Sequence, residues 1–71
     1  MTTEALVEAL RMRRPFKVTT ADGRTFEVPH PEFAALTRSG RLLYVMLEND
    51  RTEALDVLLI TGLEQEAPLP L

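Results

Sequence analysis

The sequence FKVTTADGRTFEV at residues 16–28 is typical of a β-hairpin, because two alternating apolar runs flank an Asp-Gly turn. The loop length sets which side chains share a face, since a one-residue slip moves every side chain to the other face. A two-residue loop, Asp22-Gly23, would place the apolar residues of the two runs on opposite faces. We therefore predict a three-residue loop, residues 21–23, closed by Gly23 with a positive φ angle. It places four apolar side chains on one face, with Phe16 opposite Val28 and Val18 opposite Phe26.

Length and composition limit the class of protein. The chain of 71 residues makes one small domain, which we place at residues 1–66. Residues 67–71, APLPL, are expected to form a flexible tail because proline cannot join a sheet interior. The chain has no cysteine, which excludes disulfides and thiolate chemistry. No apolar run reaches the roughly 20 residues of a membrane helix, so we expect a cytoplasmic protein with no membrane partner.

The N-terminal residues predict an amphipathic helix. Thr2 or Thr3 can cap its first turn, and the helix is expected to run to about Arg14, where Pro15 stops it. Its apolar stripe consists of Leu6, Ala9 and Leu10, widened by Val7. This stripe must cover an apolar surface, and the hairpin that follows is the nearest one.

The remaining residues predict short strands joined by tight turns. We expect a short strand at 35–37, a three-residue loop at 38–40, a long strand at 41–48, a strand at 53–57, a buried corner at Leu58-Leu59 and a strand at 60–65 broken by Gly62. The predicted fold is therefore mainly β (α+β): an N-terminal helix followed by a small, strongly bent five-stranded antiparallel sheet or barrel. Such a barrel, with the helix over one open end, resembles those of Sm-like and SH3-like proteins.

A second resemblance covers most of the chain. Pro15-Phe16, Asp22-Gly23-Arg24, the segment HPEF at 30–33 and the segment ITGLE at 60–64 resemble a set of short, uncharacterised bacterial proteins. That resemblance implies no activity, cofactor or substrate. The RNA-binding motifs of Sm-like proteins have no residue-by-residue match, since Leu58-Leu59-Ile60 stands where their Lys-His or Arg-Gly step would fall.

The long strand is apolar on both faces. Leu42, Tyr44 and Met46 point one way, and Leu43, Val45 and Leu47 point the other. Such a strand is either covered twice or has one face in a subunit interface, and a domain of this size has little material for a second cover. We therefore predict a homo-oligomer, with a dimer favoured, whose interface contains Leu42, Tyr44 and Met46.

The net charge of −3 hides an asymmetry along the chain. Residues 11–41 carry seven basic and three acidic side chains, whereas residues 42–71 carry six acidic side chains and only Arg51 as a base. Arg11, Arg13, Arg14 and Lys17 are candidate contacts for a polyanion, although arginines near a helix C-terminus also complement the helix dipole. RNA binding through the basic segment Arg11–Arg41 is the alternative function, and the negative overall charge disfavours it.

Catalytic and metal chemistry have little support in this sequence. His30 is the only histidine, and it lies between two prolines without a second imidazole or a thiolate to complete a site. We expect no catalysis, no cofactor and no metal. The sequence favours a non-enzymatic interaction module whose partner is itself, with another protein as a second possibility and nucleic acid as a less favoured one.

Overall fold

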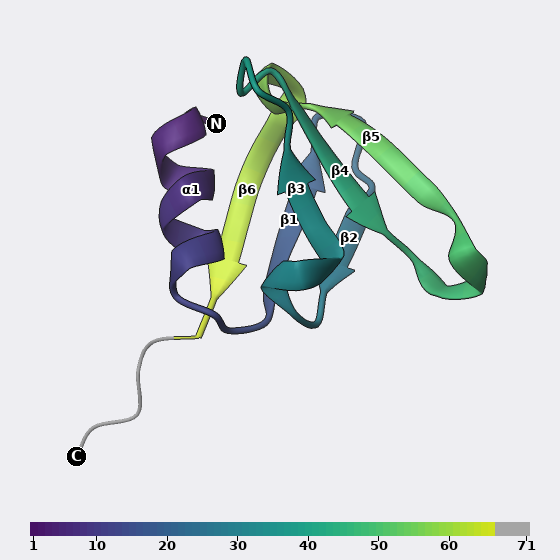
Figure 1. Ribbon diagram of the computed structural model, residues 1–71. Coiled ribbons are helices and arrows are strands. Elements are labelled where there is room, and N and C mark those ends of the chain that lie inside the picture. Colours follow the sequence, from purple (N-terminus) through teal and green to yellow (C-terminus); the bar gives the residue numbers. More distant parts are fainter. Residues whose placement is uncertain (67–71) are drawn as a thin grey trace.

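A computed structural model describes residues 1–66 and contains one helix and six strands in two three-stranded antiparallel sheets (Figure 1). One sheet has the order β2-β1-β6 and the other the order β3-β4-β5. The bounds are α1 Thr3–Arg11, β1 Phe16–Thr20, β2 Thr25–Val28, β3 Ala34–Leu36, β4 Leu42–Met46, β5 Thr52–Asp56 and β6 Ile60–Gln65, with 3₁₀ turns at Pro31–Phe33, Glu48–Asp50 and Val57–Leu59. The mainly-β α+β class is confirmed. Within residues 1–66 the six strands form two open sheets and not the predicted five-stranded sheet or barrel. The predicted tail at 67–71 lies outside the described residues.

The first hairpin has the predicted register. The amide of Thr20 donates to the carbonyl of Arg24 (2.8 Å), and the amide of Gly23 donates to the carbonyl of Thr20 (2.9 Å). Gly23 has a φ of +86°, which glycine adopts without a steric penalty. The two cross-strand pairs, Phe16 with Val28 and Val18 with Phe26, lie on one buried face. The three-residue loop is therefore confirmed.

The second hairpin differs from the prediction by one residue. Thr37 pairs with Leu42, as shown by the hydrogen bond from the Thr37 amide to the Leu42 carbonyl (2.9 Å), so the loop spans the four residues 38–41. Gly40 closes the same kind of turn as Gly23, with a φ of +75°. The Arg41 carbonyl accepts from the amide of Val57 (2.9 Å), which continues the hydrogen bonding between β4 and β5 by one residue beyond the pair of Leu42 and Asp56. The long strand therefore begins at Leu42, and it ends at Met46.

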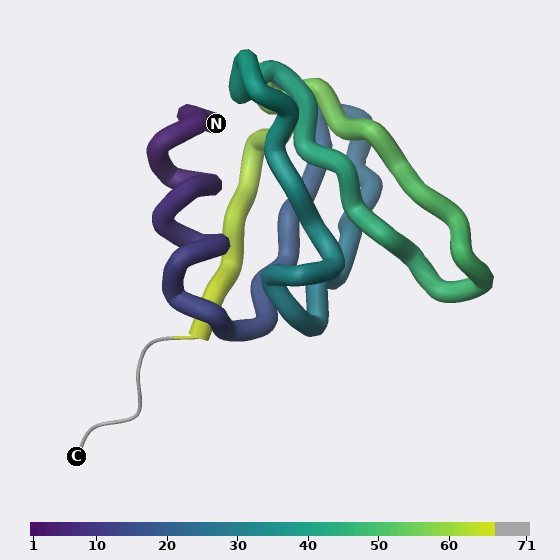
Figure 2. The backbone as a smooth tube through the Cα atoms, in the orientation of Figure 1, coloured from purple at the N-terminus to yellow at the C-terminus, as the bar shows by residue number. Residues whose placement is uncertain are grey.

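The helix is shorter than predicted, and it packs beside a strand. Thr2 is the cap: its Oγ1 accepts from the amide of Ala5 (3.2 Å). The helix ends at Arg11 rather than about Arg14, because Arg13 takes a positive φ of 55° before Pro15 is reached. Figures 1 and 2 show α1 lying alongside β6, and Leu6 and Ala9 are buried in the core.

Two side chains hold α1 at its ends. The Thr3 hydroxyl donates to the carbonyl of Gly40 (3.0 Å) in the second hairpin loop. At the other end, Nε2 of Gln65 on β6 donates to the carbonyls of Ala9 (2.9 Å) and Arg14 (3.3 Å). The helix is thereby fixed to both sheets through residues far away in the sequence.

The predicted buried corner at Leu58-Leu59 is wrong. These side chains are 78% and 55% exposed, and only Val57 of the 3₁₀ turn is buried. The backbone of the turn is fixed instead of its side chains: the carboxylate of Asp56 accepts from the Leu58 amide (2.9 Å), and the Leu59 carbonyl accepts from the Ala21 amide (2.7 Å). β6 then runs unbroken from Ile60 through Gly62, with a register shift opposite Thr19 and Thr20.

The core lies between the two sheets and the helix. Among residues 1–66, its buried apolar residues are Leu6, Ala9, Phe16, Val18, Phe26, Val28, Ala34, Leu43, Val45, Leu55, Val57 and Ile60. β4 therefore contributes Leu43 and Val45 to the core and turns its other face outward. No helix within residues 1–66 has the length and apolar character needed to cross a membrane.

Candidate functional site

The outward face of the β3-β4-β5 sheet brings the three predicted interface residues together. Tyr44 (42% exposed) and Met46 (49% exposed) lie on it, with Leu42 half-buried at the other end of β4. The strand register places Ala35 of β3 and Ala54 of β5 on either side of Tyr44. We call these five residues the outer β4 face.

The outer β4 face has a simple shape and little charge. Large side chains on the central strand form a ridge, and the flanking alanines leave a shallow depression on each side of Tyr44. Asp56, opposite Leu42, is the one charged residue that the strands of this sheet place on the face, and its carboxylate already caps the Leu58 amide. A surface of this kind can bury apolar area without burying an unpaired charge.

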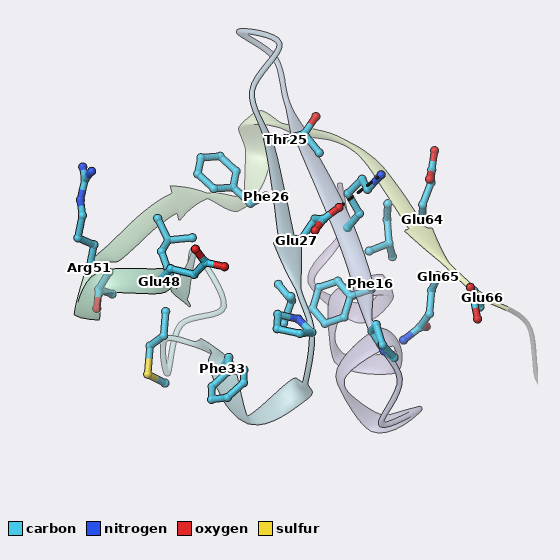
Figure 3. A pocket seen from close by; sticks show the side chains of 18 of the residues that line it. Phe16, Thr25, Phe26, Glu27, Phe33, Glu48, Arg51, Glu64, Gln65 and Glu66 are labelled. Carbon is cyan, nitrogen blue, oxygen red and sulfur yellow. Dashed lines mark ion pairs between the residues drawn. The ribbon is translucent and has the colours of Figure 1, made fainter.

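A second surface is an open cleft along β2, with a volume of about 1780 Å³ (Figure 3). It reaches from β2 to the end of the β4–β5 hairpin on one side and to the end of β6 on the other. We call it the β2 cleft. Its apolar lining consists of Pro15, Phe16, Phe26, Val28, Pro29, Phe33, Met46, Leu47 and Leu63.

The rim of the β2 cleft is acidic. Five carboxylates line it (Glu27, Glu48, Asp50, Glu64 and Glu66), against the two bases Lys17 and Arg51. The charge of Lys17 is partly neutralised, because its Nζ lies 3.9 Å from Glu27 Oε1 on β2. On its other side, the residue paired with Lys17 on β6 is Glu64. The rim therefore presents a negative field over an apolar floor, which favours a ligand that is both basic and apolar.

Arg24 connects the two sheets next to this cleft. Its Nε lies 2.9 Å from Asp22 Oδ2 in its own turn, and its Nη1 lies 2.9 Å from Glu53 Oε1 on β5. The guanidinium also lies over the ring of Phe26, 5.3 Å from its centroid. Hydrogen bonds to Glu53 and Asp22 raise the pKa of Arg24, and hydrogen bonds from the Thr20 hydroxyl and then from Arg24 lower the pKa of Asp22.

This lowered pKa predicts a pH dependence. The ordinary value for Asp22 is 3.8, so the stability that its carboxylate contributes is fully present above that pH and is lost as the pH falls through the lower folded value. Asp22→Asn should therefore reduce the acid sensitivity of the melting temperature below about pH 4. Melting curves of both proteins across this range measure it, and profiles that run parallel would contradict it.

The four predicted polyanion contacts differ in exposure and in their neighbours. Arg11 and Arg13 are exposed near the end of α1, whereas Lys17 lies between two glutamates on the sheet. Arg14 is half-buried, and its Nη1 has no hydrogen-bond partner within residues 1–66. The polyanion contacts predicted from four basic side chains within seven residues therefore stay a prediction, with Arg11 and Arg13 as the exposed members near α1.

His30 packs against an aromatic ring at the turn after β2. Its ring lies edge-on to Phe33, with centroids 6.0 Å apart and planes at 83°. Within residues 1–66, no three side chains of histidine, cysteine, aspartate or glutamate are grouped so that they could hold a metal ion.

Comparisons with known proteins found no matching family model, no similar curated protein and no similar solved structure. The resemblance to short bacterial proteins therefore stays a prediction, and so does the resemblance to Sm-like proteins except for the closed barrel, which the two separate sheets of residues 1–66 do not form. The two surfaces described above are what the chain itself offers for assigning a function.

Proposed function

We propose that this protein is a non-enzymatic interaction module that acts in the cytoplasm as a homodimer, joined through the outer β4 face. The observation that carries the proposal is the position of Tyr44 and Met46. Both are large apolar side chains, both are more than two-fifths exposed, and both lie at the centre of a sheet rather than at its edge. Covering them would remove apolar surface from water, worth about 25 cal/mol per Å².

A second copy of this chain fits the face because the face is complementary to itself. Two sheets that pack face to face lie about 10 Å apart, with side chains of one between those of the other. In a two-fold contact, the ridge of one copy can enter the depression over Ala35 or Ala54 of the other, and the same contact is then made twice. Tyr44 suits the centre because its ring is apolar and its hydroxyl can reach the polar rim.

RNA binding through the basic segment is the second candidate, and the contacts give it less support. Arg24 is paired with Asp22 and Glu53, and Lys17 is paired with Glu27. Arg11 and Arg13 are the exposed members of the candidate set. Retention on heparin that persists at moderate salt, and that disappears when both arginines are replaced, would favour this candidate over the homodimer.

The homodimer predicts that Tyr44→Asp yields a folded monomer. A carboxylate at the centre of the contact would be buried without a partner, which costs about 3–5 kcal/mol and so weakens association by about 100-fold or more. Sedimentation of wild type and variant at high micromolar concentration measures the change, and circular dichroism checks that the variant stays folded.

Val7→Asp is the matched control. Val7 is 40% exposed, close to the 42% of Tyr44, but it lies on α1 beside the other sheet. This variant should remain a dimer. A wild-type protein that sediments as a monomer would overturn the proposal. So would Tyr44→Asp and Val7→Asp variants that both sediment as monomers.

A further inference from the structure

The edge of β2 is open on the side that faces the β2 cleft. Among the described strands, β2 pairs only with β1. In an antiparallel pair, alternate residues direct their backbone groups to the partner. The hydrogen bond from the Thr20 amide to the Arg24 carbonyl shows that Arg24 directs its backbone groups to β1. By the same alternation, the backbone groups of Phe26 and Val28 also bond to β1. Thr25 and Glu27 therefore direct their N–H and C=O groups away from β1, and both residues line the cleft.

The opposite wall of the cleft comes from the β4–β5 hairpin, which projects away from the body of the protein in Figure 1. Met46, Leu47 and Thr52 line this wall. The Arg24–Glu53 ion pair ties the two sheets together, but no backbone ladder joins β2 to this hairpin in residues 1–66. The cleft thus combines a free strand edge with an apolar floor.

We propose that the β2 cleft binds an extended segment of another protein, in which basic and apolar residues alternate, as an added strand on β2. The backbone of the segment would bond to Thr25 and Glu27. Because side chains alternate along a strand, its apolar residues would contact Phe26 and Met46, and its basic residues would face Glu27 and the acidic rim.

Two properties of the cleft select this occupant. Its volume of about 1780 Å³ exceeds the roughly 300–1,000 Å³ of small-molecule pockets, so it suits a length of chain. Its rim carries five carboxylates and two bases, which attracts a cationic segment and repels an acidic one. Nucleic acid, with its phosphates, is disfavoured by the same charges.

The probe is a capped peptide of alternating lysine and valine, KVKVKVK, and its charge-reversed partner is EVEVEVE. We expect KVKVKVK to bind the full chain and EVEVEVE not to bind. In NMR spectra of the protein, the amide shifts should concentrate at Thr25, Glu27 and the Met46 end of β4. Equal binding of both peptides, or shifts centred on Tyr44, would overturn the proposal.

Charge variants test the recognition. Glu27→Lys should weaken KVKVKVK binding by about tenfold, because it replaces an attraction at the strand edge by a repulsion. Glu8→Lys makes the same change in charge at an exposed position of α1, away from the cleft, and should leave the affinity unchanged. Equal weakening by both variants would show that only net charge matters, and would contradict a specific site.

A backbone variant tests the strand addition itself. Glu27→Pro removes an outward N–H that β1 does not use, and proline is tolerated at such positions of edge strands. We expect it to abolish binding. If it fails to fold, the amide shifts of the wild-type protein still decide the question. Met46 borders both the cleft and the outer β4 face, so the peptide is also tested on the monomeric Tyr44→Asp variant, in which no second copy covers Met46. This variant should bind KVKVKVK at least as tightly as the wild type does, whether or not the homodimer exists.

Discussion

Leu43→Ala is expected to lower the free energy of unfolding by about 3–5 kcal/mol, a large part of the total for a domain of this size. Leu43 is fully buried on β4, the central strand of its sheet, where Leu36 and Leu55 flank it on the neighbouring strands. The truncation leaves a cavity that the sheet cannot fill without moving both neighbours. Urea unfolding at one fixed protein concentration measures the loss, since dimerisation would make stability depend on concentration.

Leu58→Ala is the control for this substitution. The same side chain is removed, but Leu58 is 78% exposed and its turn is held by backbone bonds. The expected change is within about 0.5 kcal/mol. A loss at Leu58 similar to that at Leu43 would mean that the turn is covered in solution, and the assignment of core and surface in this part of the chain would then be wrong.

Gly40→Ala should lower the free energy of unfolding by about 2–3 kcal/mol, compared with about 1 kcal/mol for Gly23→Ala. Both glycines have positive φ angles, so both substitutions carry the strain of the left-handed conformation. A Cβ at Gly23 would meet open space, whereas a Cβ at Gly40 would lie 2.7 Å from Cγ2 of Thr3. Gly40→Ala must therefore also displace the start of α1, whose Thr3 hydroxyl bonds to the Gly40 carbonyl.

A double variant separates the two causes. Thr3→Ser removes the clashing methyl group and keeps the hydroxyl, so Gly40→Ala should cost less in the Thr3→Ser background than in the wild type. The same cycle with Gly23→Ala should show no coupling, since Gly23 is not in contact with Thr3. Equal costs for the two glycine substitutions in the wild type would contradict the role assigned to the helix contact.

The first hairpin could be predicted because one local rule governed it. Only the three-residue loop puts Val18 and Phe26 on the same face as their neighbours, and the structure has that register. The exposure of Tyr44 opposite the buried Leu43 follows from the same alternation along β4. Where buried residues alternate along a strand and the turn residues fit the same register, the sequence alone is enough to predict the register of a hairpin.

The errors come from contacts between residues far apart in the sequence. The loop at 38–41 is one residue longer than predicted, and its last residue, Arg41, accepts a hydrogen bond from the distant Val57 amide that no local pattern contains. Leu58 and Leu59 are apolar yet exposed. The contact that fixes this turn is made by its backbone, since the Leu59 carbonyl accepts from the Ala21 amide of the first hairpin loop. The position of Ala35 beside Tyr44 could have been found by alternation only once the second loop had its correct length, and that of Ala54 depends on the separate connection between β4 and β5.

The hydrogen bonds from Gln65 to the end of α1 have a consequence for the order in which the protein folds. The hydrogen bond from Gln65 to Ala9 spans 56 positions, and β1 must also wait for β6 to gain its second neighbour. The β1–β2 hairpin closes a loop of three residues, whereas pairing β1 with β6 closes most of the chain between them and carries the larger entropic cost, so we expect the hairpin to form first. The helix and the last strand therefore stabilise each other, and we expect that removing either α1 or β6 would destabilise the other.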